Sequence, residues 1–284
     1  MNFRFSAVPS FLVLGSLVLV TALSSPAEQG VTKATPDAES RRTQLLSLFD
    51  EEWQYELRVD PETATQLGDN RYNDRLSDHS PQFHNADVEA RRKFLNRFEA
   101  IDPKGLSAQD ALSRDLMIRN LREDIEGAQF KSWEMPVNQM GGPHLNLLEL
   151  VTLTPFNNLH DYDNYLARLH QVQRVLDQVM ENMRQGMQDH LMPPRYLLEK
   201  VTVQAQEIAD KSGEASPFAK PVANFPPQIS AADQQRLRSA VLSVINEEIL
   251  PTYKRFTAFV RDQYAPKPPD RNGHWAHTGR EQMR

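Results

Sequence analysis

The sequence predicts an all-α fold built from long antiparallel helices and helical hairpins. Three observations lead to this prediction. Apolar residues recur at intervals of three and four along most of the chain, as they do on the buried face of an amphipathic helix. Serine or aspartate stands just before several of these stretches, at the position of a helix N-cap. The sequence has no run of alternating β-branched residues, which would indicate a strand.

The first 27 residues are predicted to be a secretory signal peptide. Arg4 provides a short basic start, an apolar run covers residues 7–23, and small residues follow, with cleavage expected near Ser24 or Ala27. An uncleaved membrane anchor is the alternative, because the run approaches the length that spans a bilayer. In both cases the protein is expected to be exported, to the periplasm or the extracellular space. Residues 28–36 are expected to form a flexible leader.

The helical domain is predicted to occupy residues 37–265. Thr35-Pro36-Asp37 is typical of a helix start, because proline is favoured at the first helical position. A single buried stripe is expected to follow, made of Leu45, Leu46, Phe49, Trp53 and Leu57. Asp60-Pro61 is expected to begin a short helix that Gly68 ends. Residues 69–80 then form a polar loop.

Two further helices are predicted to begin at Ser80-Pro81 and at Ser107, where Ser107-x-x-Asp110 is similar to a capping box. Residues 128–143 have no helical period and are expected to be an ordered, extended crossing segment. The strongest helix is predicted from Asp161 to Leu191. Its apolar seam consists of Tyr162, Leu166, Leu169, Val172, Leu176, Val179, Met183 and Met187.

The end of the domain is predicted to hold two more helices. Pro193-Pro194 starts the first, which Ser212-Gly213 closes, and a proline-rich loop covers residues 214–229. Ser230 caps the second. Pro251 lies inside this last helix and is expected to kink it near Glu247, where a carbonyl loses its hydrogen-bond donor.

Composition excludes several classes of function. The net charge of −6 gives no basic face for nucleic acid. The sequence contains no cysteine, so disulfides, a thiolate zinc site, a cysteine nucleophile and a lipoprotein anchor are not expected. After signal cleavage, no association with a membrane is expected.

The chemical motifs are few. The sequence has no HExxH, no GxSxG and no glycine-rich phosphate loop. His144, His160, His170 and His190 are scattered and are predicted to be ordinary surface or core residues. The adjacent carboxylates at 50–52, at 161 and 163, and at 247–248 are predicted to be solvated charges on helix surfaces. No catalytic, metal-binding or cofactor-binding residue is therefore assigned in this chain.

Two segments allow a functional interpretation. Residues 138–148 contain Gly141-Gly142-Pro143 before His144, and such a turn either shapes a cleft or merely connects helices. Near the C-terminus, His274 and His277 are spaced to share one helical face. Zinc needs three or four ligands, however, and the flanking sequence has no apolar period. Residues 266–284 are therefore expected to be a disordered or aberrant tail.

Four segments of the chain resemble the N-terminal half of the domain-of-unknown-function family 885, a group of mostly secreted bacterial proteins. The segments are PETATQLGDNRYNDRLSDHSP (61–81), NQMGGPHLNLLEL (138–150), LTPFNNLHDYDNYLARL (153–169) and GMQDHLMPPRYLLEKV (186–201). The resemblance extends from about Leu48 to Tyr264. It implies a helical fold related to the zincin metallopeptidases, with the metal motif, His-Glu followed closely by another His, in a C-terminal half that this sequence does not reach. His274 does not match that motif, because no glutamate follows it.

The resemblance makes this chain an exported part of a zinc-peptidase-like protein of uncharacterised function, lacking the catalytic motif and inactive alone. Zinc is expected only in the missing half, and a peptide is the expected substrate of full-length relatives. A frameshift or a premature stop would explain the short C-terminus. Two alternatives remain: a stand-alone periplasmic helical binding or scaffolding module, and one half of a split metallopeptidase completed by a separately encoded C-terminal half.

Overall fold

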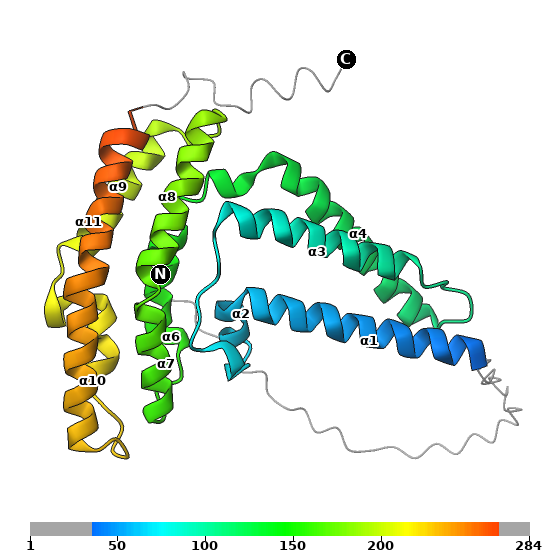
Figure 1. The fold of residues 1–284 in the computed structure, drawn as a ribbon, viewed down its shortest axis with the longest axis horizontal. Helices are drawn as coiled ribbons and strands as arrows, with labels where there is room; N and C mark the ends of the chain where they lie inside the picture. The colour runs from blue at the N-terminus through cyan, green and yellow to red at the C-terminus, as the bar shows by residue number, and fades with distance from the viewer. Residues whose placement is uncertain (1–35, 267–284) are drawn as a thin grey trace, which may run out of the picture. The chain divides into compact units, whose positions relative to one another are not determined.

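The structure, a computed structural model, describes residues 36–266. The predicted signal peptide and leader, and the tail beyond residue 266, lie outside this range. Within it the all-α prediction is confirmed, since the regular elements are helices and the β-type pairing is limited to one isolated bridge between Asn138 and Gly141 (Figure 1). None of these described helices is both long and apolar enough to cross a bilayer.

Three helices share a small hydrophobic core: α1 (Pro36–Val59), α3 (Pro81–Glu99) and α4 (Ala108–Gly127). The predicted starts of α3 and α4 are confirmed. The Ser80 hydroxyl accepts a hydrogen bond from the Phe83 N–H at 3.1 Å, and the Ser107 hydroxyl accepts one from the Asp110 N–H at 3.0 Å. The core that these helices enclose consists of Leu45, Leu48, Phe98, Ile101, Ile118 and Leu121. The predicted buried stripe of α1 was wrong at Leu46 and Trp53, which are exposed.

The larger core lies in a bundle of five helices: α7 (Leu159–Leu169), α8 (Val172–Gln188), α9 (Arg195–Ala209), α10 (Ala231–Val244) and α11 (Leu250–Phe259). Helix α11 packs against both α8 and α9 (Figure 1). Tyr165, Tyr253 and Phe256 are fully enclosed in this core. The predicted seam is confirmed, because its members are buried or pack against the buried cluster.

Short elements connect the helices. They are α2 (Pro61–Gln66), η1 (Asn70–Tyr72), η2 (Ala128–Phe130), η3 (Ser132–Glu134), α5 (Pro143–Asn146), η4 (Leu147–Glu149), α6 (Leu150–Leu153) and η5 (Gly213–Ala215). The crossing segment at 128–143 has no α-helix before Pro143, but it is less extended than predicted, because it contains the 3-10 helices η2 and η3. Asp60 caps α2 by accepting a hydrogen bond from the Thr63 N–H at 2.9 Å.

The prediction of one helix from Asp161 to Leu191 was wrong. The chain forms α7 and α8, separated at His170 and Gln171. The Gln171 side-chain amide donates to the Ala167 carbonyl at 3.0 Å and also to the Asp74 carbonyl of a distant loop at 2.7 Å. The break therefore results from a tertiary contact, which no local periodicity encodes. The start also lies earlier than predicted, because Asn158 and Asp161 form a capping box around Leu159.

Proline has different effects at two places. Before Pro251 the structure has the π-helix η7 (Ile245–Ile249), in which the Leu250 N–H bonds to the Ile245 carbonyl. This irregularity lies where the missing proline N–H was predicted to disturb the helix. The predicted loop at 214–229, in contrast, contains the 3-10 helix η6 (Pro217–Val222). Phe218 is fully buried there, and its carbonyl accepts a hydrogen bond from the Tyr165 hydroxyl at 2.8 Å.

Candidate functional site

The polar loop at residues 69–80, here called the docked loop, is fixed to the bundle by a buried arginine. Arg168 on α7 is 0% exposed. Its guanidinium donates to the carbonyls of Arg75 at 2.8 Å and Pro61 at 3.0 Å, and to the Thr65 hydroxyl at 2.6 Å. Burial lowers the pKa of Arg168 from its ordinary value. A buried guanidinium with backbone acceptors fixes the direction of the loop as well as its position.

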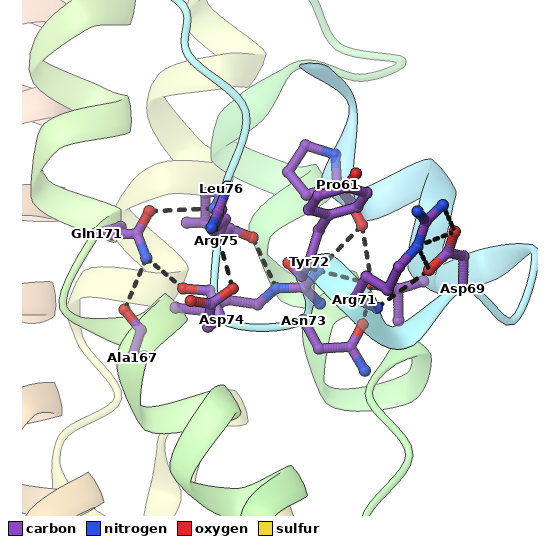
Figure 2. Close-up of polar contacts among 12 residues, drawn as sticks. Pro61, Asp69, Arg71, Tyr72, Asn73, Asp74, Arg75, Leu76, Ala167 and Gln171 are labelled. Atoms are coloured by element: carbon purple, nitrogen blue, oxygen red, sulfur yellow. Dashed lines mark hydrogen bonds and ion pairs between the residues drawn. The ribbon is translucent and has the colours of Figure 1, made fainter. Parts of the chain in front are cut away.

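The same face of the next helix continues this attachment. Gln171 receives a hydrogen bond from the Leu76 N–H at 3.1 Å, and Figure 2 shows it lying between Ala167 and the loop residues Asp74 and Leu76. About two and three turns further on, Gln178 accepts from the His79 N–H at 3.0 Å, and the Asn182 amide donates to the His79 carbonyl at 2.7 Å. The polar positions therefore follow the helical repeat.

A polar hollow of about 290 Å³ lies beside the docked loop. On one side it is lined by α2 and the loop, on the other by α5, η4 and α6, and Val175 contributes from α8. The carboxylates of Asp60, Glu62 and Glu149 line it together with His79. Burial lowers the pKa of His79, which favours the neutral ring. The hollow therefore has acceptor groups and an excess of negative charge.

Glu62 links α2 to the docked loop beside this hollow. Its carboxylate accepts hydrogen bonds from the Ser77 N–H at 3.1 Å and from the Ser77 hydroxyl at 2.6 Å. Part of its hydrogen-bonding capacity is thus used within the protein. In the part of the chain that the structure describes, no group of three histidine or acidic side chains is placed to hold a metal ion. These residues do not fit a zinc site.

The chain matches, over residues 61–282, the model of a family described as bacterial protein of unknown function (DUF885). The chain belongs to this family. The match extends to residue 282, so the prediction that the family resemblance ends near Tyr264 and gives way to an aberrant tail was wrong. His274 and His277 fall within the match but lie outside the described residues. A comparison with curated proteins gave no match.

Among solved structures, the chain resembles one described as "the putative lipoprotein from Colwellia psychrerythraea". The TM-score is 0.71 at 14% sequence identity, and the similarity covers 83% of this chain and 43% of that one. At this identity the likeness concerns the fold. This DUF885 chain spans less than half the length of that protein.

Three of the four segments that carry the family resemblance meet at this site. The docked loop belongs to the first segment, Arg168 to the third, and Pro143, Asn146 and Leu147, which line the polar hollow, to the second. The hydrogen-bond partners of Arg168 lie 93 to 107 positions away in the sequence. The periodicity of apolar residues did not reveal them. The available signal was the polar series 168, 171, 178 and 182, spaced like one helix face.

Residues 138–148 were interpreted either as a turn that shapes a cleft or as a plain connection between helices, and each interpretation describes part of the structure. The segment connects helices, and it also lines the polar hollow. A Cβ on Gly142, whose φ is +134°, would lie 2.6 Å from the Pro136 carbonyl, so only glycine fits this turn. His144 does not reach the hollow. It is 0% exposed, stacks on Phe256 with ring centroids 5.7 Å apart, and its carbonyl accepts from the Tyr253 hydroxyl at 2.9 Å.

The prediction of solvated carboxylates was wrong for Glu52 and for Asp161, which are each 8% exposed. Glu52 lies on the buried side of α1. Burial, reinforced by the carboxylate of Glu56, raises the pKa of Glu52 to about 7. Glu56 in turn pairs with Arg91 at 3.0 Å, and Arg91 pairs with Asp87 at 2.8 Å. Glu52 therefore lies beside a charged network because its helix turns it inward, which adjacency in the sequence could not indicate.

The other sequence-assigned histidines occupy separate places. His170 Nδ1 lies 2.9 Å from a Glu248 carboxylate oxygen in a solvent-exposed pair. His190 has a φ of +59° in the connection between α8 and α9. His160 is on the first turn of α7, and Asp161 beside it serves the capping box rather than a solvated surface.

An apolar hollow of about 1280 Å³ lies between residues 127–140 and the connection from α8 to α9. It is open enough to leave Met140 84% exposed and Phe130 58% exposed. Close packing behind the hollow depends on Gly186, because a Cβ there would lie 2.4 Å from the Glu134 carbonyl and 2.7 Å from that of Leu191. Gly186 and Leu191 belong to the fourth family segment (186–201).

Proposed function

We propose that this chain is an exported helical part of a zinc-peptidase-like DUF885 protein, in which it supplies one wall of a substrate cleft. The observation that carries the proposal is that three of the four family segments converge on the polar hollow, beside which Arg168 holds the docked loop. Side chains held this rigidly are suited to positioning a substrate. The zincin relationship comes from the resemblance described above. Zinc would be bound by residues outside this chain, which alone would be inactive.

Support for a larger working unit comes from the solved structure that shares this fold. The chain covers 43% of that protein, so the same arrangement of helices occurs there within a longer polypeptide. A separately encoded second polypeptide could provide the remainder, as in a split metallopeptidase. Export is supported by the apolar run at residues 7–23 and by the description of the structural neighbour as a lipoprotein.

A second candidate function is a stand-alone periplasmic binding module. The apolar hollow of about 1280 Å³ favours it, because exposed apolar concavities of this size are typical of binding sites. The two candidates differ in the DNA that follows the gene. A downstream reading frame with the His-Glu motif supports the peptidase, whereas its lack supports the binding module.

The direct test is hydrolysis of a mixture of peptides, followed by mass spectrometry, with the purified chain in the presence of zinc. We expect no cleavage, and elemental analysis after dialysis should give well below one zinc per chain. Cleavage that a chelator abolishes would contradict the proposal that catalysis needs residues outside this chain. If zinc were bound tightly, loss of that zinc from the double variant His274→Ala, His277→Ala would locate it in the tail.

A further inference from the structure

The apolar hollow has two walls of different origin. Phe130, Met135 and Met140 come from residues 127–140, and Leu191, Met192 and Leu197 come from the connection between α8 and α9 and the start of α9. Methionine side chains are flexible and polarisable, so they adapt to apolar partners of different shapes. The hollow of about 1280 Å³ exceeds the ~300–1,000 Å³ of a typical small-molecule pocket. It has room for a segment of several residues.

The charges of the hollow are already paired with each other. Lys131 and Asp189 both line it, and the Lys131 ammonium contacts the Asp189 carboxylate. The same ammonium lies 3.4 Å from the carboxylate of the buried Glu134. A charged ligand would have to lose water without gaining a free partner of opposite charge, which costs free energy. The hollow is therefore suited to an uncharged ligand.

Amide groups give the hollow a preference for a peptide over a lipid chain. Gln129, Asn138 and Gln139 are part of its lining. The Gln139 carbonyl is held by the Gln204 side chain at 3.1 Å. Gln129 and Asn138 are exposed, so their side-chain amides can accept from a ligand N–H and donate to a ligand carbonyl. An acyl chain has no such donor, while a peptide backbone has one per residue.

We propose that this hollow binds an uncharged, apolar segment of a peptide or unfolded protein, with its side chains against the methionine-lined walls and its backbone near the amides. The proposal adds a ligand class to the proposed function, and the peptide assignment rests on the lining of the hollow rather than on peptidase activity. A binding module without any peptidase role would use the hollow in the same way.

The test is equilibrium binding, measured by fluorescence anisotropy with the purified processed chain. The probes are fluorescein-labelled hexapeptides with acetylated and amidated ends: one apolar, one with a central lysine and one with a central aspartate. We expect the apolar peptide to bind at least about tenfold more tightly than either charged one. No binding of the apolar peptide up to about 1 mM, or equal binding of all three, would overturn the proposal.

Two matched variants locate the binding site. Met140→Glu places a charge at the mouth of the hollow, and Val203→Glu places one on α9, outside its lining, at a side chain that is 58% exposed. Both positions are exposed, so both variants should keep the circular dichroism of the parent. Met140→Glu should weaken binding at least about tenfold and Val203→Glu less than about twofold. Equal loss in both variants, or none in either, would contradict the assignment.

A fatty acid added as competitor distinguishes an acyl ligand. The peptide assignment holds if the fatty acid does not displace the apolar peptide, or if it binds more weakly than that peptide. The assignment is wrong if the fatty acid binds and the apolar peptide does not. Because binding is read without turnover, these outcomes do not depend on peptide hydrolysis. Binding without any hydrolysis, even in a complete DUF885 protein, would reject the peptidase proposal and leave this one intact.

Discussion

Replacing Gly186 by alanine tests the close packing between α8 and the segment that carries Glu134. The added Cβ would lie 2.4 Å from the Glu134 carbonyl oxygen and 2.7 Å from the Leu191 carbonyl oxygen, and both are backbone atoms that cannot turn aside. Overpacking of this kind costs about 1–3 kcal/mol, and the upper part of that range is expected here. Alanine regains about 1 kcal/mol of helix propensity. The free energy of unfolding should therefore fall by about 1–2 kcal/mol.

The matched control is Gly127→Ala at the end of α4, where an added Cβ would have nothing within 4 Å. It should raise the free energy of unfolding by up to about 1 kcal/mol through propensity alone. Thermal unfolding followed by circular dichroism reads the difference. With about 2–4 °C per kcal/mol for a domain of this size, Gly186→Ala should melt about 2–8 °C below the parent, and Gly127→Ala at or above it. Equal melting temperatures for both variants would refute the packing argument.

Three further predictions concern the docked loop, the buried carboxylate and processing. Arg168→Met should lower the free energy of unfolding by about 2–4 kcal/mol, since carbonyls of the loop lose a buried donor. Urea unfolding measures this loss, and proteolysis in the loop should be faster. The exposed control Arg195→Met should change the free energy of unfolding by less than about 0.5 kcal/mol. Because the pKa of Glu52 is raised to about 7 in the fold from 4.5, stability should be highest below the unfolded pKa, fall as the pH rises towards 7 and then level off. The shift corresponds to about 3 kcal/mol, reduced to about 1–2 kcal/mol by solvent screening, and Glu52→Gln should remove this slope in urea titrations at several pH values; a slope that persists in the variant would show another group to be responsible. Intact-mass measurement of exported protein should give an N-terminus near Ser25 or Glu28, whereas a membrane-bound protein that still begins at Met1 would refute signal cleavage.

Local features of the fold could be predicted from the sequence, because their causes lie within a few residues. The caps at Ser80 and Ser107 depend on a side chain and an N–H three positions away. The irregularity before Pro251 follows from one missing donor. Features with distant causes could not be predicted. Gln171 interrupts the long helix because it also bonds to the Asp74 carbonyl, 97 positions away.

The candidate site was less accessible from the sequence than the fold. The glycines of segment 138–148 indicated a turn that could shape a cleft, yet its histidine, His144, is a core residue. The charged side chains that line the polar hollow come from other segments. The sequence does not distinguish Arg168 from the other arginines, because its hydrogen-bond partners are far away along the chain. Phe218 lies in a proline-rich stretch whose composition is typical of an exposed loop, so its complete burial against the bundle could not be predicted. Burial of this kind is decided by packing between distant segments.

The most direct test of the account is to mix this chain with the remaining part of a longer DUF885 protein. That part is the region that does not correspond to this chain, expressed separately. Size-exclusion chromatography with light scattering reads complex formation, and mass spectrometry reads peptide hydrolysis. The account predicts a one-to-one complex that cleaves peptides and loses this activity with a chelator, while neither part is active alone. It would be contradicted if the two parts stayed separate and inactive while this chain alone eluted as a clean monomer with a sharp thermal transition.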